Sequence, residues 1–402
     1  MRRVLVLNRY RLASAAFHRW IGDAAELYLV NDGARTYRRA PDRDAIEAGY
    51  AQIVEVDDYL DDATVLPAAR DLIARHGIDT VIAFSEYDVL RAARLRTEFG
   101  LAGQDVASAE LFRDKLAMKR RAQTAGIPVV PFAPLGSSDD EVARLGYPLI
   151  VKPRHGADSQ GVVVVRDASE LARVTTALDD PTAYLAEQYV EHELLHTDGV
   201  VVDGELRFFE AWQWSQTLLA SHQDASAPTV ALTLDARDPR RADLRDLTRQ
   251  ALLALGAPPV TAFHVEFFAT DHGLLLNEAA SRIGGARIQP ALRRIHGVDL
   301  AELTARCTVE PRAAVTLPPP LAPAGGFLLV YGTPDGRTGA PATCPLPGVA
   351  DYETTVPLAG GDTMNVAHPE LVVSATAVGR SRDEVRSRLD DFNDWFVRST
   401  TA

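Results

Sequence analysis

Cysteine and lysine are both scarce in this 402-residue chain. Only two cysteines occur, Cys307 and Cys344, with neither the CxxC spacing of a thiolate metal site nor the pairs of a disulfide framework. This usage is typical of a reducing compartment and predicts a cytoplasmic protein. Of the 42 basic residues only three are lysines, Lys115, Lys119 and Lys152. A compact ammonium group suits a phosphate site where a guanidinium is too large, so the positions of these three lysines matter.

Long apolar runs and an excess of positive charge are also absent. No apolar run approaches the ~20 residues that span a bilayer, and the short N-terminal run Val4–Leu7 predicts a buried strand instead of a signal peptide. A net charge of −13 argues against nucleic-acid and membrane-surface partners, since both are polyanions. Neither GxGxxG nor GxxxxGK[ST] occurs in the first hundred residues, which excludes the dinucleotide fingerprint and the Walker loop there.

The order of apolar runs predicts an α/β protein of several packed units, and 47 % hydrophobic residues suffice for their cores. Residues 1–107 alternate short buried strands with a helix over Thr64–His76 that Gly77 ends, which favours a parallel sheet. Residues 108–310 begin with a predicted helix, Ala109–Ala125, and continue mostly as strands. The proline-rich segment 311–323 predicts a linker to a small third unit, 324–402. The expected strands of the first unit are Val4–Leu7, Leu27–Val30, Ile53–Val56 and Thr80–Phe84.

Two lysines stand where a polyphosphate could bind. Lys152 ends an apolar strand and precedes a turn that contains Gly156, Ser159 and Gly161, so a point charge and free backbone donors lie close together. Lys115 begins a predicted helix and could supply a second charge. An ordinary hairpin that happens to contain a lysine would show the same sequence pattern. Lys119 fits no motif, and we expect it to be solvated.

Carboxylates mark the other half of the predicted site. The apolar strand Leu185–Val190 contains Glu187 and is followed by Glu193; such a strand can pair with an adenine edge while an acid holds the ribose, although both acids could equally face water. Glu266 and Glu278 lie on adjacent predicted strands joined by a short turn. Because neighbouring strands are ~4.8 Å apart, these two acids could share magnesium. Arg282 could then grip the transferred phosphoryl group or a substrate carboxylate.

In order and spacing these segments resemble the ATP-grasp superfamily, and most closely its carboxylate–amine ligases of the L-amino acid ligase type. The segments Phe84-Ser85-Glu86 and Arg91-Ala92-Ala93 look like the same group. The resemblance implies an N-terminal α/β domain (1–107), a two-part ATP-grasp body (108–310) and a small C-terminal domain (324–402). It also implies these roles: Lys115, Lys152, Ser159 and Gly161 at the ATP phosphates, with Lys152 and Arg282 catalytic; Glu187, Tyr189 and Val190 at the adenine; Glu193 at the ribose; Glu266 and Glu278 at Mg²⁺, for which Mn²⁺ could substitute.

The resemblance further implies a reaction. ATP and magnesium would convert a small-molecule carboxylate to an acyl phosphate, and an amine would attack it to give an amide, ADP and phosphate. We expect amino acids as the acid and the amine, and a homodimer is left open. Bicarbonate as the acid or a thiol as the acceptor are alternatives on the same fold.

Some residues depart from the family pattern or allow another reading. Ala280 stands where many ATP-grasp enzymes have an asparagine, and Gln160 lies in a turn that is often richer in glycine. A nucleotide-binding module without turnover is therefore a further alternative. His192, Glu193 and His196 form an HExxH sequence, the signature of a zinc peptidase if it lies on a helix. The strand-rich surroundings leave little room for that helix, which makes the zinc reading the weaker one.

Overall fold

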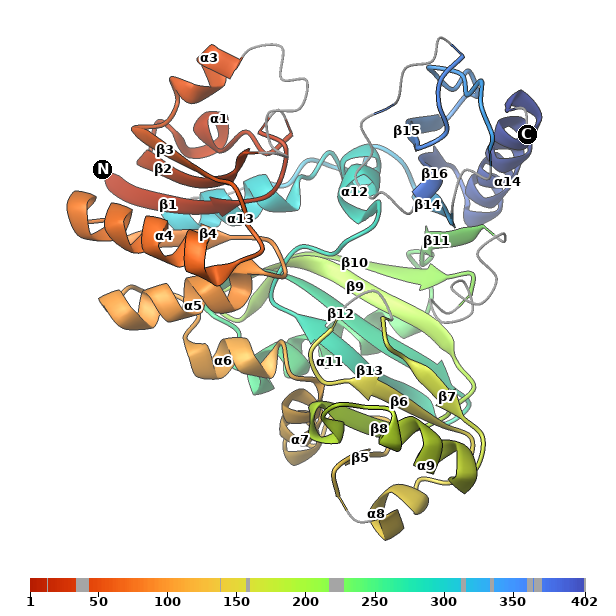
Figure 1. The fold of residues 1–402 in the computed structure, drawn as a ribbon. Helices are drawn as coiled ribbons and strands as arrows, with labels where there is room; N and C mark the ends of the chain where they lie inside the picture. The colour runs from red at the N-terminus through yellow and green to blue at the C-terminus, as the bar shows by residue number, and fades with distance from the viewer. Residues whose placement is uncertain are drawn as a thin grey trace.

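The computed structural model describes residues 1–12, 14–33, 43–137, 139–156, 160–216, 228–311, 316–332, 336–359, 364 and 371–400. Within these residues the strands form two four-stranded sheets and one eight-stranded sheet, with helices packed on each (Figure 1). No helix in the described part of the chain has the length and apolarity to cross a membrane. The predicted α/β class is confirmed.

The N-terminal sheet is parallel throughout, as predicted, with the strand order β3-β2-β1-β4. Its apolar runs are buried on both faces because helices lie on either side, which is the usual state of a parallel sheet. Helix α4 (Asp62–His76) begins at the Asp61 cap and ends at Gly77, whose φ of 60° is left-handed. The strands are β1 (Arg2–Asn8), β2 (Ala25–Asp32), β3 (Gln52–Val56) and β4 (Thr80–Ala83).

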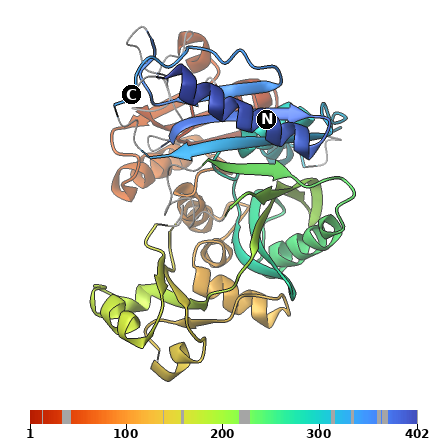
Figure 2. The ribbon, with the colours of Figure 1, turned by 90° about the vertical axis from the view of Figure 1, so that its right-hand side faces the viewer.

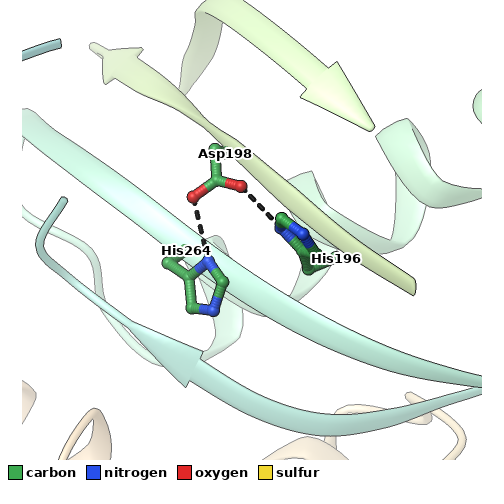
Figure 3. A group of neighbouring side chains, drawn as sticks. All are labelled: His196, Asp198 and His264. Carbon is green, nitrogen blue, oxygen red and sulfur yellow. Dashed lines mark hydrogen bonds and ion pairs between the residues drawn. The ribbon is translucent and has the colours of Figure 1, made fainter. Parts of the chain in front are cut away.

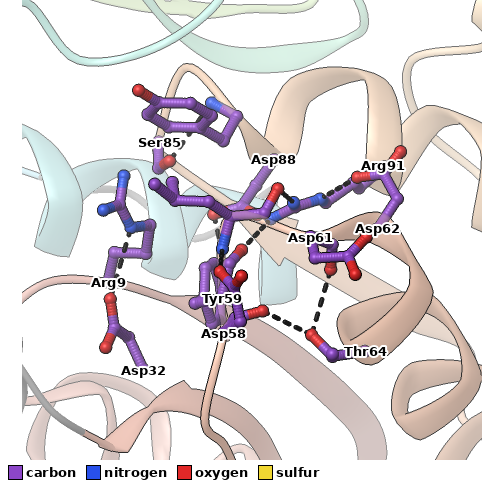
Figure 4. A network of polar contacts seen from close by, with 12 residues as sticks. Arg9, Asp32, Asp58, Tyr59, Asp61, Asp62, Thr64, Ser85, Asp88 and Arg91 are labelled. Atoms are coloured by element: carbon purple, nitrogen blue, oxygen red, sulfur yellow. Dashed lines mark hydrogen bonds and ion pairs between the residues drawn. The ribbon is translucent and has the colours of Figure 1, made fainter.

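A buried arginine ties this first unit together (Figure 4). Arg91, on α5 (Asp88–Phe99), is 2 % exposed and donates to Asp62, to Asp88 and to the carbonyl oxygens of Tyr59 and Leu60. It therefore fixes the loop before α4 to α5. In this structure the Arg91-Ala92-Ala93 segment serves the packing of the unit.

The small four-stranded sheet is antiparallel and has the order β5-β8-β6-β7. The helix predicted over Ala109–Ala125 is in fact two helices, α6 (Val106–Leu111) and α7 (Lys115–Thr124). The Asp114 side chain accepts from the backbone N–H groups of Leu116 and Ala117 and so starts a new helix. The strands are β5 (Phe132–Pro134), β6 (Leu149–Pro153), β7 (Val163–Val165) and β8 (Tyr184–Gln188), and the neighbouring helices are α8 (Asp139–Ala143), α9 (Ala168–Thr176) and η1 (Pro181–Ala183).

The eight-stranded sheet has the order β13-β12-β9-β10-β11-β14-β16-β15. Strands from before and after the proline-rich segment thus lie in one sheet, and α14 packs against the later ones (Figure 2). The domain boundaries 107/108 and 310/324 remain predictions. The strands are β9 (Glu193–Val202), β10 (Glu205–Trp214), β11 (Thr229–Thr233), β12 (Val260–Thr270), β13 (Gly273–Ala280), β14 (Ala324–Tyr331), β15 (Val349–Thr354) and β16 (Leu371–Gly379). The remaining helices are α1 (Phe17–Ile21), α3 (Arg43–Glu47), α11 (Arg240–Ala254), α12 (Ile288–His296), α13 (Leu300–Val309) and α14 (Arg382–Ser399).

The two faces of this sheet have different surroundings. Leu195 and Phe267 face the core that α7 and α11 cover. His196 lies directly across from Glu266 of β12 and from Trp212 of β10, so these three side chains share the opposite face. The candidate site lies on that face, at the β12–β13 edge nearest the small sheet.

Candidate active site

All three lysines of the chain belong to ion pairs in one region, although they come from α7 and β6. Lys115 Nζ lies 3.1 Å from Glu278 Oε1 and donates to the carbonyl oxygen of Gly156 at 2.8 Å. Lys152 Nζ lies 2.9 Å from Glu187 Oε2. The predicted phosphate lysines are therefore brought together with two of the predicted acids.

The expectation that Lys119 is solvated is wrong. Its side chain is fully buried, and its Nζ lies 3.0 Å from Glu187 Oε1. The physical reason is helical periodicity: residue 119 follows residue 115 by four positions, so both face the same side of α7. Burial lowers the pKa of Lys119 to about 8. Glu187 is also buried; burial alone would raise its pKa, but the charges of Lys119 and Lys152 outweigh that effect and lower it.

The two predicted magnesium ligands lie directly opposite each other, Glu266 on β12 and Glu278 on β13. A bulge follows Glu266 and leaves Asn277 as an extra residue on β13. Asn277 Nδ2 donates to Glu266 Oε2 at 2.8 Å, and Lys152 Nζ donates to Asn277 Oδ1 at 3.3 Å. Two facing carboxylates beside an amide oxygen are hard oxygen donors, so the residues present fit a magnesium ion.

His196, Asp198 and His264 form a cluster of side chains on β9 and β12 (Figure 3), and Glu266 contacts this cluster. His196 Nδ1 and His264 Nδ1 lie 2.7 and 2.9 Å from separate oxygens of Asp198, and His264 Nε2 lies 3.4 Å from Glu266 Oε1. Burial would lower the pKa of His264, but the two neighbouring carboxylates raise it to about 9. Burial would raise the pKa values of Asp198 and Glu266, yet the histidines bring both down to about 2.

The zinc-peptidase alternative is wrong, because Glu193 and His196 lie on strand β9 and His192 directly precedes it, so the HExxH segment is not helical. Instead, His192 stacks on Phe268 with ring centroids 3.7 Å apart. Asp198 and His264 lie at the site, although no motif in the sequence marks them. The signal was the spacing of His196 and Asp198, and of His264 and Glu266, by two residues, which places each pair on one face of a strand.

Arg282 faces the N-terminal unit. Its guanidinium is paired with Glu86, and Arg113 is paired with the other carboxylate oxygen of Glu86. All three side chains are between 16 and 17 % exposed, so the pairs are shielded but not sealed from water. Burial lowers the pKa of Arg113, which also lies within the field of Glu278 and Arg282. A positively charged group thus lies next to the facing carboxylates.

The predicted nucleotide residues are less closely grouped. Tyr189 is 43 % exposed at the end of β8 and Val190 accepts a hydrogen bond from His192. Glu193 pairs with Arg240 at 2.6 Å and, by strand alternation, points to the side of Leu195, away from Glu266. Gly161 has a left-handed φ of 72° in the turn after β6. Ser159 lies outside the described residues. The roles of these residues stay predictions.

Comparison with known proteins identifies the class. Residues 120–285 match the ATP-grasp domain family. The chain is 27 % identical over 292 residues to an L-arginine-specific L-amino acid ligase of Bacillus subtilis, covering 70 % of each chain. It is 32 % identical over 232 residues to a D-alanine–D-alanine ligase of Sodalis glossinidius, covering 53 % of this chain and 62 % of that enzyme. An L-amino acid ligase structure from Bacillus licheniformis superposes with a TM-score of 0.71 at 14 % identity, covering 100 % of this chain and 98 % of that one.

Residues 120–285 therefore form an ATP-grasp domain, and the predicted ATP-grasp architecture and the resemblance to the carboxylate–amine ligases of this superfamily are confirmed. Both of these sequence relatives are ligases that join amino acids, in agreement with the predicted enzyme class, an ATP-dependent ligase that forms C–N bonds.

Proposed function

We propose that the protein activates the carboxylate of an amino acid as an acyl phosphate and joins it to the amine of a second amino acid, releasing ADP and phosphate. The observation that carries the proposal is the pair of facing carboxylates, Glu266 and Glu278. Lys115 pairs with Glu278, and Lys152 donates to the Asn277 amide that contacts Glu266. The similarity to L-amino acid ligase over 70 % of both chains supports amino acids as the substrate class.

The lysines would bind the triphosphate by exchanging their carboxylate partners for phosphate oxygens. Lys115 now pairs with Glu278, and Lys152 with Glu187. Phosphate oxygens entering between them would satisfy the same ammonium groups while Lys119 keeps Glu187 neutralised. When bound at Glu266 and Glu278, magnesium would supply the charge that offsets the negative phosphates. Most of the rate acceleration would then come from positioning and electrostatic stabilisation.

Arg282 would act at the acyl end. Its Nη1 donates to the Ile283 carbonyl oxygen at 2.7 Å, which fixes the guanidinium plane, and Glu86 occupies its Nε. A substrate carboxylate or transferred phosphoryl group is an anion like Glu86 and would be held by charge-assisted hydrogen bonds. Arg282 therefore orients the carboxylate for attack on the terminal phosphorus and stabilises the charge that develops there.

A phosphate-release screen over amino acids, singly and in pairs, with ATP and Mg²⁺ tests the proposal. We expect ADP and phosphate to appear only when a suitable pair is supplied, together with one new amide by mass spectrometry. Formation of AMP and pyrophosphate would contradict the acyl-phosphate route. ADP release without any amide product would contradict the ligase assignment.

Three finer points belong to the same proposal. Mn²⁺ is expected to replace Mg²⁺, because carboxylate and amide oxygens bind both ions. The protein is expected to act in the cytoplasm, which agrees with its two unpaired cysteines. A homodimer is tested by light scattering of the purified chain.

A further inference from the structure

His264 lies between two carboxylates, and each of its ring nitrogens faces one of them. Nδ1 lies 2.9 Å from Asp198 Oδ1, and Nε2 lies 3.4 Å from Glu266 Oε1. The ring is 14 % exposed, so its orientation is set by these neighbours more than by water. Since carboxylates are acceptors only, both ring nitrogens are placed to donate.

Asp198, the partner of His264 Nδ1, is held in one orientation. Asp198 is fully buried, and its second oxygen accepts from His196 Nδ1 at 2.7 Å. His196 is also fully buried, and its ring lies parallel to that of Trp212 with centroids 5.8 Å apart. The Asp198 carboxylate therefore cannot turn without breaking a buried hydrogen bond, which makes it a rigid anchor for the His264 ring.

Glu266, on the other side of the His264 ring, is also held by two contacts. Glu266 meets His264 through Oε1 and Asn277 through Oε2, so both of its oxygens are oriented. We propose that His264 is a positioning residue that holds Glu266 in the orientation required for a divalent cation, with Asp198 as its anchor. This inference rests on the proposed function, since that function makes Glu266 a magnesium ligand. Partners of this outer kind typically change metal affinity by about 10–100-fold when they are removed.

Two substitutions separate the contacts of the His264 ring. The Asn amide in His264→Asn can replace Nδ1 toward Asp198 but does not reach Glu266, whereas the longer Gln amide in His264→Gln can replace Nε2. We expect Mn²⁺, titrated into nucleotide-free protein and followed by the EPR signal of the free ion, to bind about 10–100-fold more weakly to His264→Asn. His264→Gln should regain most of that affinity. His272→Asn, in the exposed turn of the same hairpin, is the matched control and should bind as the wild type does.

Wild-type Mn²⁺ affinity in folded His264→Asn would overturn the proposal. If that variant does not fold, Asp198→Asn serves in its place, and unchanged affinity there would have the same consequence. An equal loss in His196→Gln and His264→Asn would mean that His196, Asp198 and His264, whose ligand atoms lie within 4.8 Å of one another, bind the ion themselves. The titration needs no amino acid, so a failed substrate screen and a failed positioning role remain separate results.

Discussion

Replacing Lys119 by methionine tests the most unexpected feature of the site. Methionine keeps the volume of the aliphatic stem and removes only the ammonium group, so no large cavity is created. Glu187, which is 2 % exposed, then loses one of the two ammonium groups that flank it and keeps only Lys152. Removing one partner of a buried ion pair costs roughly 3–5 kcal/mol. Because Lys152 remains, we expect the lower end, about 3 kcal/mol.

A loss of this size is measurable in two ways. For a unit of 150–250 residues, each kcal/mol lowers Tm by about 2–4 °C, so the transition should fall by about 6–12 °C. The second effect is on nucleotide binding. With Lys119 gone, Lys152 is the only charge that neutralises Glu187, and it is less available to phosphate. We expect the Kd for ADP, measured by calorimetry, to rise about tenfold, which corresponds to about 1.4 kcal/mol.

Arg120→Ala on the exposed side of the same helix is the control. It removes a neighbouring positive charge without touching Glu187, and both Tm and the Kd for ADP should stay near the wild-type values. If Lys119→Met behaves like Arg120→Ala in both measurements, Lys119 is not part of the phosphate network, and the reasoning from its burial fails.

The other predictions concern the same face of the sheet. Lys152→Ala and Glu278→Ala should each lower kcat for ADP release by about 10²–10³-fold, because Lys152 positions phosphate and Glu278 holds the magnesium ion; a loss under threefold in either would contradict the site. His192→Ala should keep the protein folded with its metal content unchanged; one zinc per wild-type chain by elemental analysis that is lost in His192→Ala would contradict the assignment of β9. Glu193→Gln should raise KM for ATP with little change in kcat if Glu193 holds the ribose. Asp198→Asn should reduce the loss of unfolding free energy at low pH, measured by urea titrations at several pH values. The pKa of Asp198 is about 2 in the folded protein against 3.8 unfolded, so the stabilisation by its carboxylate is present above pH 3.8 and is lost as the pH falls toward 2.

The N-terminal unit could be predicted from local pattern alone. Its four strands are short apolar runs, and α4 carries both an Asp cap and a glycine end signal. The segment Ala109–Ala125 was predicted as a single helix because apolar spacing continues across Asp114. The cap at Asp114 was the available signal for the break, and it is what places Lys115 in the first turn of α7.

The pairing of distant strands could not be predicted in the same way. His196 and Glu266 lie directly across from each other, yet 70 positions along the chain separate them, and nothing in a single sequence states that β9 pairs with β12. Without that register, the only pattern in the sequence that includes His196 is the HExxH motif. The bulge that brings Asn277 to Glu266 is likewise a property of two paired strands and has no signature in either strand by itself.

The choice of lysine at position 119 follows from burial, in a chain that otherwise prefers arginine. A guanidinium carries five N–H donors, and at a fully buried position each one without a partner costs free energy, whereas an ammonium carries three. Another carboxylate of the same site, Glu86, differs from Glu187 in this respect. It is also held by two positive side chains, but these are Arg113 and Arg282, which are 16 to 17 % exposed. Water can reach their remaining donors. Where the carboxylate is sealed, as at Glu187, the compact ammonium of Lys119 leaves fewer donors unsatisfied and allows a second lysine to approach the other oxygen at 2.9 Å.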